Sequence, residues 1–301
     1  MENPLVSILL ITMNHEKFIE QAVLSAINQG YPNLEIIFLD NNSVDHTYEI
    51  AERTFQNSKI PHQLIRNKEN HGVSKNLNIM LSFATGKYVA ILSGDDWWKE
   101  NLITEKVAFI GLGYDFVLSD GYKYLEETGE TIPVYTQKEK DKIINTLPRF
   151  FKENVVANKT ANVGTFIKRD LLVKHPFDEN INTEDWDMNL RMTHLGYKLG
   201  FIDQKLFYYR ILPSSLSRKW DVMEESYHKV TSKYLDYIKT DKTLYKKYLL
   251  QKLMFKYEIL LSKIDHDSEK KQMIKTWRTE KIRIKYKQPI QFFKIILNRF
   301  S

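Results

Sequence analysis

The sequence predicts an α/β fold with a mostly parallel sheet flanked by helices, followed by a helical C-terminal extension. Apolar runs of five to eight residues, typical of buried strands, alternate with segments of helical periodicity along the first hundred residues. Strands that alternate with helices pair in parallel through right-handed crossovers. From residue 221 onward the pattern becomes helical and basic.

The strands and helices can be followed in chain order because Gly, Pro and capping residues separate them. Gly30 and Pro32 end the first helix, Ser43 or Asp45 can cap the second, and Gly86 ends the third. The expected strands are residues 6–13, 35–39, 62–66 and 88–92, and the expected helices are residues 18–27, 43–55 and 73–83.

Two adjacent carboxylates, Asp95 and Asp96, follow the fourth expected strand. They come after Ser93 and Gly94, where the apolar run YVAIL ends. Open α/β sheets bind ligands at the carboxyl ends of their strands, and carboxylates there suit Mg²⁺ or Mn²⁺, which takes its other ligands from water and phosphate. The same residues also fit a turn that ends the strand and caps the next helix, so both interpretations stay open.

Composition narrows the class of protein. The chain has 301 residues, of which 43% are hydrophobic, enough for one large domain or a domain with an appendage. It has no cysteine, which excludes disulfides, thiolate metal sites and cysteine nucleophiles. The N-terminus lacks the basic region of a signal peptide, and no stretch approaches the roughly 20 apolar residues that cross a bilayer. These features predict a cytoplasmic protein.

The net charge of +6 is unevenly distributed. Residues 221–301 contain 19 Lys or Arg and 10 Asp or Glu, a net charge of +9, which leaves −3 for residues 1–220. This asymmetry predicts two domains, a mildly acidic α/β domain at residues 1–220 and a basic helical extension at residues 221–301.

Five motifs occur in a recognisable order between residues 6 and 218. They are VSILLITMN with NQGYPNLE, then IIFLDNNSVDHT, NHGVSKNLN, ATGKYVAILSGDDWW, and TEDWDMNLRMTHLGYKLGFID, which leads to LFYYRILPSSLSR. In these motifs the chain resembles glycosyltransferase family 2, whose members use nucleotide sugars. The resemblance implies the GT-A fold, a Rossmann-like sheet flanked by helices. It also implies an inverting transfer of one sugar to a hydroxyl group of a glycan or lipid-linked acceptor, in bacterial surface polysaccharide synthesis.

The resemblance assigns donor binding to the ends of the first two strands. Thr12 and Asn14 are expected to line the nucleotide pocket, and Asp40 with Asn41 to hold the nucleoside. Many relatives have an acid where this chain has Asn41, but an amide carbonyl can still accept the N3 proton of uracil or thymine. UDP is the expected nucleotide. A polar strand exit and a capping turn would explain the same residues without a ligand.

The resemblance also gives Asp95 and Asp96 separate roles. Asp96 is expected to coordinate Mn²⁺ or Mg²⁺, and Asp95 to contact the ribose or the water shell of the metal. The metal would neutralise charge on the departing diphosphate. Leu77 and Leu212 stand where many relatives have Arg and His, so we expect no donor contact at residue 77 and no histidine metal ligand at residue 212.

Glu184 and Asp185 match the family's catalytic acid pair, and Asp185 is the expected base. It would take the proton of an acceptor hydroxyl in a single displacement with inversion. Glu184, Trp186 and Trp97 are the expected acceptor contacts, together with the segments 114–141 and 158–166. Acids at a helix start also suit the macrodipole, and tryptophans equally suit a core.

Other functions remain as alternatives. A catalytically diverged module that binds nucleotide sugars or glycans would fit the residues that depart from the family pattern. A nicotinamide or flavin protein is disfavoured because no G-x-G-x-x-G follows the first strand. Nucleic-acid binding would depend on the basic tail alone, which has no recognition motif, so no nucleic-acid partner is expected.

The tail itself has two interpretations. Residues 245–264 predict an amphipathic helix, and residues 276–300 interleave Lys and Arg with aromatic and branched apolar side chains. This pattern fits a peripheral contact with the inner face of the cytoplasmic membrane. It equally fits a helical extension packed on the body or on a second subunit, which would make a homo-oligomer.

Overall fold

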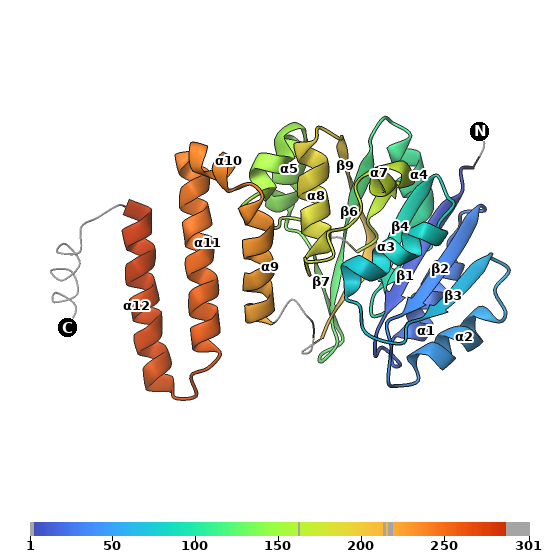
Figure 1. Ribbon diagram of the computed structural model, residues 1–301, viewed down its shortest axis with the longest axis horizontal. Helices are drawn as coiled ribbons and strands as arrows, with labels where there is room; N and C mark the ends of the chain where they lie inside the picture. Colours follow the sequence, from blue (N-terminus) through green and yellow to red (C-terminus); the bar gives the residue numbers. More distant parts are fainter. Residues whose placement is uncertain (1–2, 162, 213–214, 216–218, 287–301) are drawn as a thin grey trace. The chain divides into compact units, whose positions relative to one another are not determined.

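The structure, a computed structural model, describes residues 3–161, 163–212, 215 and 219–286 (Figure 1). The chain divides into two compact units, one of Met1–Phe151 and Lys159–Pro213, the other of Lys152–Asn158 and Ser214–Ser301. The expected division at residue 220 did not include the return of residues 152–158 to the second unit, because charge patterning does not report which segments pack together.

The first unit contains strands and helices that alternate along the first half of the chain, as the sequence predicts. In the described residues its strands are β1 (Val6–Thr12), β2 (Leu34–Asp40), β3 (His62–Arg66), β4 (Tyr88–Ser93), β5 (Trp97–Trp98), β6 (Phe116–Leu125), β7 (Glu130–Pro133), β8 (Phe166–Lys168) and β9 (Leu199–Ile211). Its helices are α1 (Ile19–Ile27), α2 (Thr47–Phe55), α3 (Val73–Phe83), α4 (Leu102–Ile110), α5 (Gln137–Thr146), α7 (Arg169–Lys174) and α8 (Glu184–His194), and the short helices η1 (Leu147–Arg149) and α6 (Phe150–Asn154) lead into the second unit.

The sheet is mostly parallel. Its strand order is β3-β2-β1-β4-β8-β6-β9-β5, with β7 paired to β6. Strands β1 to β4 pair in parallel, and so do β6 and β9. The three-residue strand β8 runs antiparallel between β4 and β6, and β5 is antiparallel to β9. Both the parallel core and its flanking helices confirm the predicted fold class.

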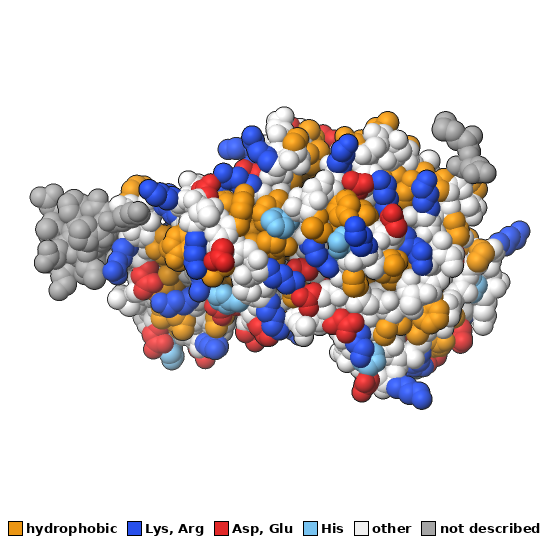
Figure 2. Space-filling model, turned by 45° about the horizontal axis from the view of Figure 1, so that its top comes forward, with side chains coloured by type: hydrophobic (Ala, Val, Ile, Leu, Met, Phe, Trp, Pro, Cys, Tyr) orange, Lys and Arg blue, Asp and Glu red, His pale blue; other side chains and the backbone are white. Residues whose placement is uncertain are grey.

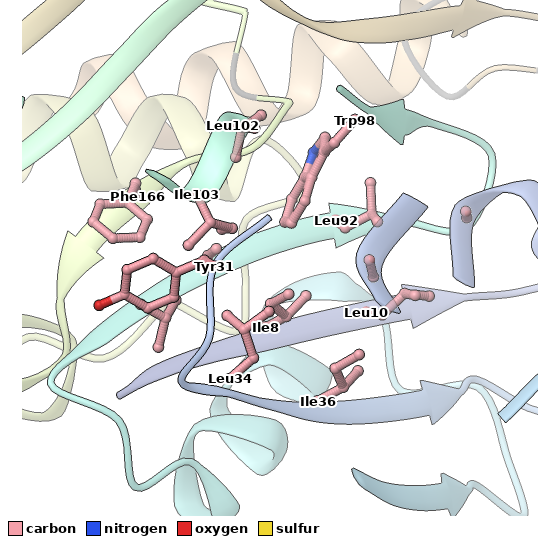
Figure 3. Packing of buried hydrophobic residues seen from close by; sticks show 14 of the residues in the cluster. Ile8, Leu10, Tyr31, Leu34, Ile36, Leu92, Trp98, Leu102, Ile103 and Phe166 are labelled. Atoms are coloured by element: carbon pink, nitrogen blue, oxygen red, sulfur yellow. The ribbon is translucent and has the colours of Figure 1, made fainter. Parts of the chain in front are cut away.

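Both faces of the sheet are covered, because side chains alternate between the faces along each strand. Ile8 and Leu10 of β1 pack in a core with residues of α1, α2 and α4, and Figure 3 shows them beside Leu92 and Trp98. The alternate residues of β1 face a second core that includes α3, α7 and α8. Leu77 of α3 is 1% exposed within that second core.

The second unit is helical in its described residues. Its main helices are α9 (Trp220–Ser232), α10 (Leu235–Thr240), α11 (Lys242–Leu261) and α12 (Asp267–Tyr286). Tyr227 of α9 packs on Tyr248 and Phe255 of α11, with ring centroids 6.0 and 5.1 Å apart. Trp277 of α12 stacks on Tyr257 of α11 at 5.9 Å.

The helix expected at residues 245–264 is present as α11, but it is not amphipathic. Tyr248 and Phe255 face α9, whereas Tyr257 faces α12. A helix that packs between two others is apolar on two sides, so its buried residues form no single stripe. Residues 287–300 of the expected basic segment lie outside the described residues. Among the described helices, none combines the length and apolarity needed to cross a membrane.

Candidate active site

The proposed site residues of the sheet lie along one edge, where the parallel strands β1, β2 and β4 end. Thr12 is opposite Asp40 in the register of β1 and β2, and Ile11 is opposite Ser93 in the register of β1 and β4. The turns that follow these strands are therefore neighbours. This is the edge at which open α/β sheets bind ligands.

Thr12 and Asn14 stand where β1 leaves the sheet. Thr12 is 2% exposed, and its Oγ1 lies 3.2 Å from Nδ1 of His15. Asn14 has a positive φ of 55°; its backbone N–H donates to Oγ of Ser43 (2.8 Å), and its Oδ1 accepts from the backbone N–H of Val44 (3.0 Å). Asn14 thus joins the ends of β1 and β2, and contact with a nucleotide stays a prediction for both residues.

Asp40 is fully buried, and its carboxylate organises the loop after β2. Oδ2 accepts from the backbone N–H of Ser43 at 3.0 Å and lies 3.6 Å from Nε of Arg66, and Oδ1 accepts from the Ser43 hydroxyl. Ser43 therefore does not cap α2; the N-cap position is His46, and Asp45 just before it accepts from the N–H of Thr47 at 3.1 Å. A nucleoside contact by Asp40 would have to share oxygens that already have partners, and it stays a prediction.

Asn41 is at the centre of a network of amide side chains. Its Oδ1 accepts from Nδ2 of Asn67 and from the backbone N–H of His71, both at 3.1 Å. Its Nδ2 donates to Oδ1 of Asn70 at 2.8 Å, and Asn67 also donates to Asn76 at 2.7 Å. The carbonyl expected to accept a base proton already accepts two bonds, which hold the loop between β3 and α3. Base recognition by Asn41 stays a prediction.

Asp95 and Asp96 form the turn between β4 and β5. The Ser93 hydroxyl donates to Oδ1 of Asp95, and the backbone N–H of Asp96 donates to the carbonyl of Ser93 at 3.1 Å. Oδ1 of Asp96 accepts from the backbone N–H of Arg210 at 2.8 Å. Burial, and then the charge of Asp95, raise the pKa of Asp96 well above its usual value, although the Arg210 N–H opposes this rise.

His15 belongs to this edge, although the sequence reasoning missed it. Its Nε2 lies 3.9 Å from Oδ2 of Asp95, and its backbone N–H donates to Oγ1 of Thr47 at 2.7 Å. The two turns approach closely because residue 94 is glycine: a Cβ at Gly94 would lie 2.3 Å from Oγ1 of Thr12. A histidine three positions after the end of the first strand was the available signal, since the same edge carries the carboxylates.

The donor chemistry of the Asp95–Asp96 turn fits a hard divalent cation. Two adjacent carboxylates, one of them buried, concentrate negative charge that a cation would offset. The described part of the chain contains no group of three or more His, Cys, Asp or Glu side chains that could hold a metal by themselves. Mg²⁺ and Mn²⁺ suit a site with few protein ligands, because they keep several waters and bind substrate phosphates.

Glu184 and Asp185 begin helix α8. Oδ1 of Asp185 accepts from the backbone N–H of Trp186 at 2.6 Å. Burial, followed by the charge of Asp185, raises the pKa of Glu184 to about 8, even though a helix start favours an ionised acid. The raised pKa means that the carboxyl of Glu184 resists ionisation in the folded protein.

The segment before β8 connects the helix of the acid pair with the edge of the sheet. Nδ2 of Asn189 on α8 donates to Oγ1 of Thr160 at 3.1 Å. Four residues later, the backbone N–H of Gly164 donates to the carbonyl of Ile91 on β4 at 3.2 Å. This stretch lies within the expected acceptor segment 158–166, and residue 162 is outside the described residues.

The tryptophans near the two carboxylate pairs have partners within the protein. Trp98 and Trp186 are each 3% exposed and pack inside the first unit. Trp97 is half-buried; its ring stacks on Tyr208 with centroids 4.7 Å apart, and Cζ of Arg210 lies 4.7 Å from its centroid. Acceptor contacts by Trp97 and Trp186 stay predictions.

The chain matches the family model described as Glycosyl transferase family 2 over residues 7–172. An uncharacterized glycosyltransferase of Methanocaldococcus jannaschii is 30% identical over 215 residues, which cover 70% of this chain and 72% of that protein. The Escherichia coli enzyme named UDP-Glc:alpha-D-GlcNAc-diphosphoundecaprenol beta-1,3-glucosyltransferase WfaP is 28% identical over 213 residues, which cover 71% of this chain and 80% of that enzyme.

Solved structures share the fold. S. aureus TarS 1-349 in complex with UDP-GlcNAc has a TM-score of 0.59 and 19% identity, covering 93% of this chain and 81% of its own. A mannosyltransferase from Pyrobaculum calidifontis in complex with GDP-Man and Mn²⁺ has a TM-score of 0.62 and 16% identity, covering 95% of this chain and 85% of its own. These likenesses concern the fold, and they confirm the GT-A prediction.

Proposed function

The chain belongs to glycosyltransferase family 2, and from this premise we propose that it is an inverting, metal-dependent transferase. It would move one sugar from a nucleoside-diphosphate sugar, with UDP as the expected nucleotide, to a hydroxyl group of an acceptor. The observation that supports this proposal most is the presence of two carboxylate pairs. In each pair, burial and the neighbouring acid raise the pKa of one carboxyl, Asp96 in the first and Glu184 in the second. Perturbed acids of this kind concentrate at functional sites.

Asp96 and Asp95 would hold the divalent cation. Oδ1 of Asp96 is engaged by the Arg210 N–H, so Oδ2 is the oxygen we assign to the metal. When bound, the cation would offset the charge that develops on the departing diphosphate.

Asp185 would act as the general base. The backbone N–H of Trp186 holds one of its oxygens at the start of α8. Because Glu184 keeps its proton up to about pH 8, it can donate a hydrogen bond to the acceptor while Asp185 accepts the proton. A protonated Glu184 thus adds no second negative charge beside the oxygen that Asp185 deprotonates.

The relatives suggest the substrate classes. The Escherichia coli relative is a glucosyltransferase named for UDP-Glc and for GlcNAc-diphosphoundecaprenol. TarS was solved in complex with UDP-GlcNAc, and the mannosyltransferase in complex with GDP-Man. We propose a glycan or lipid-linked acceptor in bacterial surface polysaccharide synthesis, with the enzyme at the inner face of the cytoplasmic membrane. A membrane contact through α12, or assembly of two chains through the same helix, would suit such an acceptor.

The test of the base is Asp185→Asn, which keeps the size and the bond to the Trp186 N–H but cannot take a proton. Transfer with a panel of UDP-, dTDP- and GDP-sugars should fall by about 10² or more, while donor affinity persists. Asp170→Asn is the matched control, because Asp170 is an exposed first-turn acid of α7. Normal turnover by a folded Asp185→Asn protein would exclude Asp185 as the base.

The test of the metal is Asp96→Asn. Divalent-ion dependence should largely disappear, and transfer should fall by orders of magnitude. Asp95→Asn should have a milder effect. Full activity of the Asp96 variant in EDTA would contradict the metal role, and a native chain that binds nucleotide sugars without hydrolysing or transferring them would favour a binding module.

A further inference from the structure

Arg210 on β9 has its guanidinium group buried beside the Asp95–Asp96 turn. The residue is 5% exposed, and its donors reach three separate segments. Nε donates to the backbone carbonyl of Asp95 at 2.8 Å, and Nη2 donates to Oε1 of Gln21 on α1 at 2.6 Å. Nη1 donates to the carboxylate of Glu126, which follows β6. Arg210 thus binds the turn through its side chain and, by the backbone N–H that donates to Asp96, through its main chain.

Aromatic rings surround the same guanidinium. Its Cζ lies 4.4 Å from the ring centroid of Phe18, 4.7 Å from Trp97 and 5.2 Å from Tyr124. Phe18 directly precedes α1, whereas Trp97 is in β5 and Tyr124 is in β6. A desolvated cation is attracted to the face of an aromatic ring. The guanidinium is therefore held by side chains from the start of α1, from β5 and from the end of β6.

The strand register explains why the rings meet. Tyr208 of β9 is opposite Trp97 in β5 and opposite Tyr122 in β6, so the three side chains form a row across the strands. Trp97 and Tyr208 stack at 4.7 Å, and Tyr122 and Tyr208 at 5.3 Å. Arg210 is two residues beyond Tyr208 and so lies on the same face. Trp97, which directly follows Asp96, is thereby locked into the sheet.

We propose that Arg210 is the positioning residue of the Asp95–Asp96 turn, and this proposal rests on the metal role proposed above. Its backbone N–H binds Oδ1 of Asp96, and its side chain binds the carbonyl of Asp95. It fixes where the two carboxylates stand relative to β9. It does not contact the diphosphate itself, because it is buried and its guanidinium is shared among three acceptors.

Lysine could not replace this group. A guanidinium has five donors in a planar fork and stacks on aromatic faces, whereas an ammonium is a compact point charge. Arg210→Lys keeps the charge and the backbone bond to Asp96 but loses the simultaneous bonds to Asp95, Gln21 and Glu126. It therefore isolates the positioning effect from the charge.

The experiment compares Arg210→Lys, Arg210→Gln and the milder Gln21→Ala with Lys87→Gln. Lys87 is the matched control, because its Nζ lies 5.5 Å from the ring of Tyr88 at the other end of β4. Mn²⁺ affinity is measured on donor-free protein by calorimetry, and amide hydrogen exchange is followed for residues 93–98. The Arg210 variants should bind Mn²⁺ at least tenfold more weakly and exchange faster in residues 93–98, with kcat largely recovered at saturating Mn²⁺. Gln21→Ala should shift both in the same direction but less, and Lys87→Gln should shift neither.

The two readouts separate the possible failures. Unchanged exchange in residues 93–98 of Arg210→Lys overturns the positioning role whether or not metal binds. Faster exchange with unchanged Mn²⁺ affinity also overturns it, because the turn would be loosened without effect on the metal. If the native protein binds no Mn²⁺, the metal role has failed and the positioning proposal that rests on it falls too; exchange then reports only whether Arg210 orders the turn. A kcat that stays about 10²-fold low at saturating Mn²⁺ would instead make Arg210 part of the chemistry.

Discussion

At the scale of single residues, the site depends on a missing side chain as much as on charged ones. Gly94 lets the end of β4 pass Thr12, whose Oγ1 and Cβ would lie 2.3 and 2.7 Å from a Cβ at residue 94. Contacts that short cannot be relieved by rotating Thr12, because its own Cβ is involved. The carboxylate turn is therefore set against β1 by the absence of one methyl group.

We expect Gly94→Ala to lower the free energy of unfolding by about 1–3 kcal/mol, as overpacking does, and to weaken Mn²⁺ binding. Denaturant unfolding and calorimetric titration measure the two effects. Gly30→Ala is the control, since the nearest atom to a Cβ there is the Glu100 carbonyl at 3.7 Å. Equal stability of the two alanine variants would contradict the steric role of Gly94.

Glu184 makes stability depend on pH in a defined direction. Its pKa is raised from 4.5 to about 8 in the folded protein, so the folded state retains a proton that the unfolded state loses. This contribution to stability is fully present below pH 4.5 and is lost as the pH rises through 8. We expect Glu184→Gln to remove this loss, so that the variant gains stability relative to the native protein between pH 5 and pH 9. Denaturant unfolding of both proteins at pH 5 and pH 9 measures this gain in stability. Glu130→Gln, at an exposed residue, is the control. A difference in unfolding free energy between Glu184→Gln and the native protein that does not change with pH would contradict the raised pKa.

At the scale of elements, the sequence predicted what local patterns determine. The strand β3 and the helix α3 occur at the expected residues 62–66 and 73–83. Strands β1 and β4 differ from expectation by one residue at one end, and β2 by one residue at each end. Apolar runs and Gly or Pro breaks are local signals, and these elements are formed by local preferences. The family motifs then placed Thr12, Asp40 and the Asp95–Asp96 turn on one edge.

What the sequence could not predict depends on contacts between distant segments. Strand β8 has three residues and is defined by its neighbours β4 and β6 rather than by its own pattern. Nothing in the sequence around Arg210 indicates that its side chain donates to a turn 115 residues away. The sequence around Asn41 also does not indicate that the side chain of Asn67 and the backbone N–H of His71 donate to its oxygen.

The loop between β3 and α3 is held by the amide network, which gives a prediction at this scale. Asn41→Asp replaces the donor to Asn70 with a carboxylate that faces the Asn70 oxygen. We expect faster hydrogen exchange in residues 67–72, a higher donor KM, and a loss of about 1–3 kcal/mol of unfolding free energy. Asn70→Asp should change little, because its carboxylate can still accept from Asn41 and from the N–H of Gly72. Identical behaviour of the two variants would show that the network does not hold the loop.

At the scale of the whole molecule, the question is what the basic charge of residues 221–301 does. On the face seen in Figure 2, Lys and Arg side chains are mixed with Asp and Glu and form no single basic field. On α12, however, Lys275, Arg278, Arg283 and Lys285 are exposed. None of the described residues of α12 is fully buried, so the helix contacts its own unit through one side only.

We expect the native chain to co-sediment with anionic vesicles at low salt. Substitution of these four cations of α12 by glutamine should reduce the co-sedimented fraction. Each cation near an anionic surface contributes about 1 kcal/mol. Changing Arg53, Lys59, Lys138 and Lys174 to glutamine is the matched control, because these cations are exposed in the first unit and the net charge changes equally. Equal sedimentation of both variants would be evidence against a membrane contact. A change in oligomeric state of the α12 variant alone would make the helix an assembly element.

The hydrogen bond from the Arg210 N–H to Asp96 also determines when, during translation, the chain can first bind a metal ion. A ribosome releases Asp96 before its partner, which is 114 residues further along the chain. Strands β1 to β4 can pair while β9 is still being synthesised. Ribosome-bound chains stalled with residue 150 outside the tunnel should therefore bind no Mn²⁺, and chains stalled beyond residue 250 should bind it. A nascent chain would then gain its cation affinity in one late step.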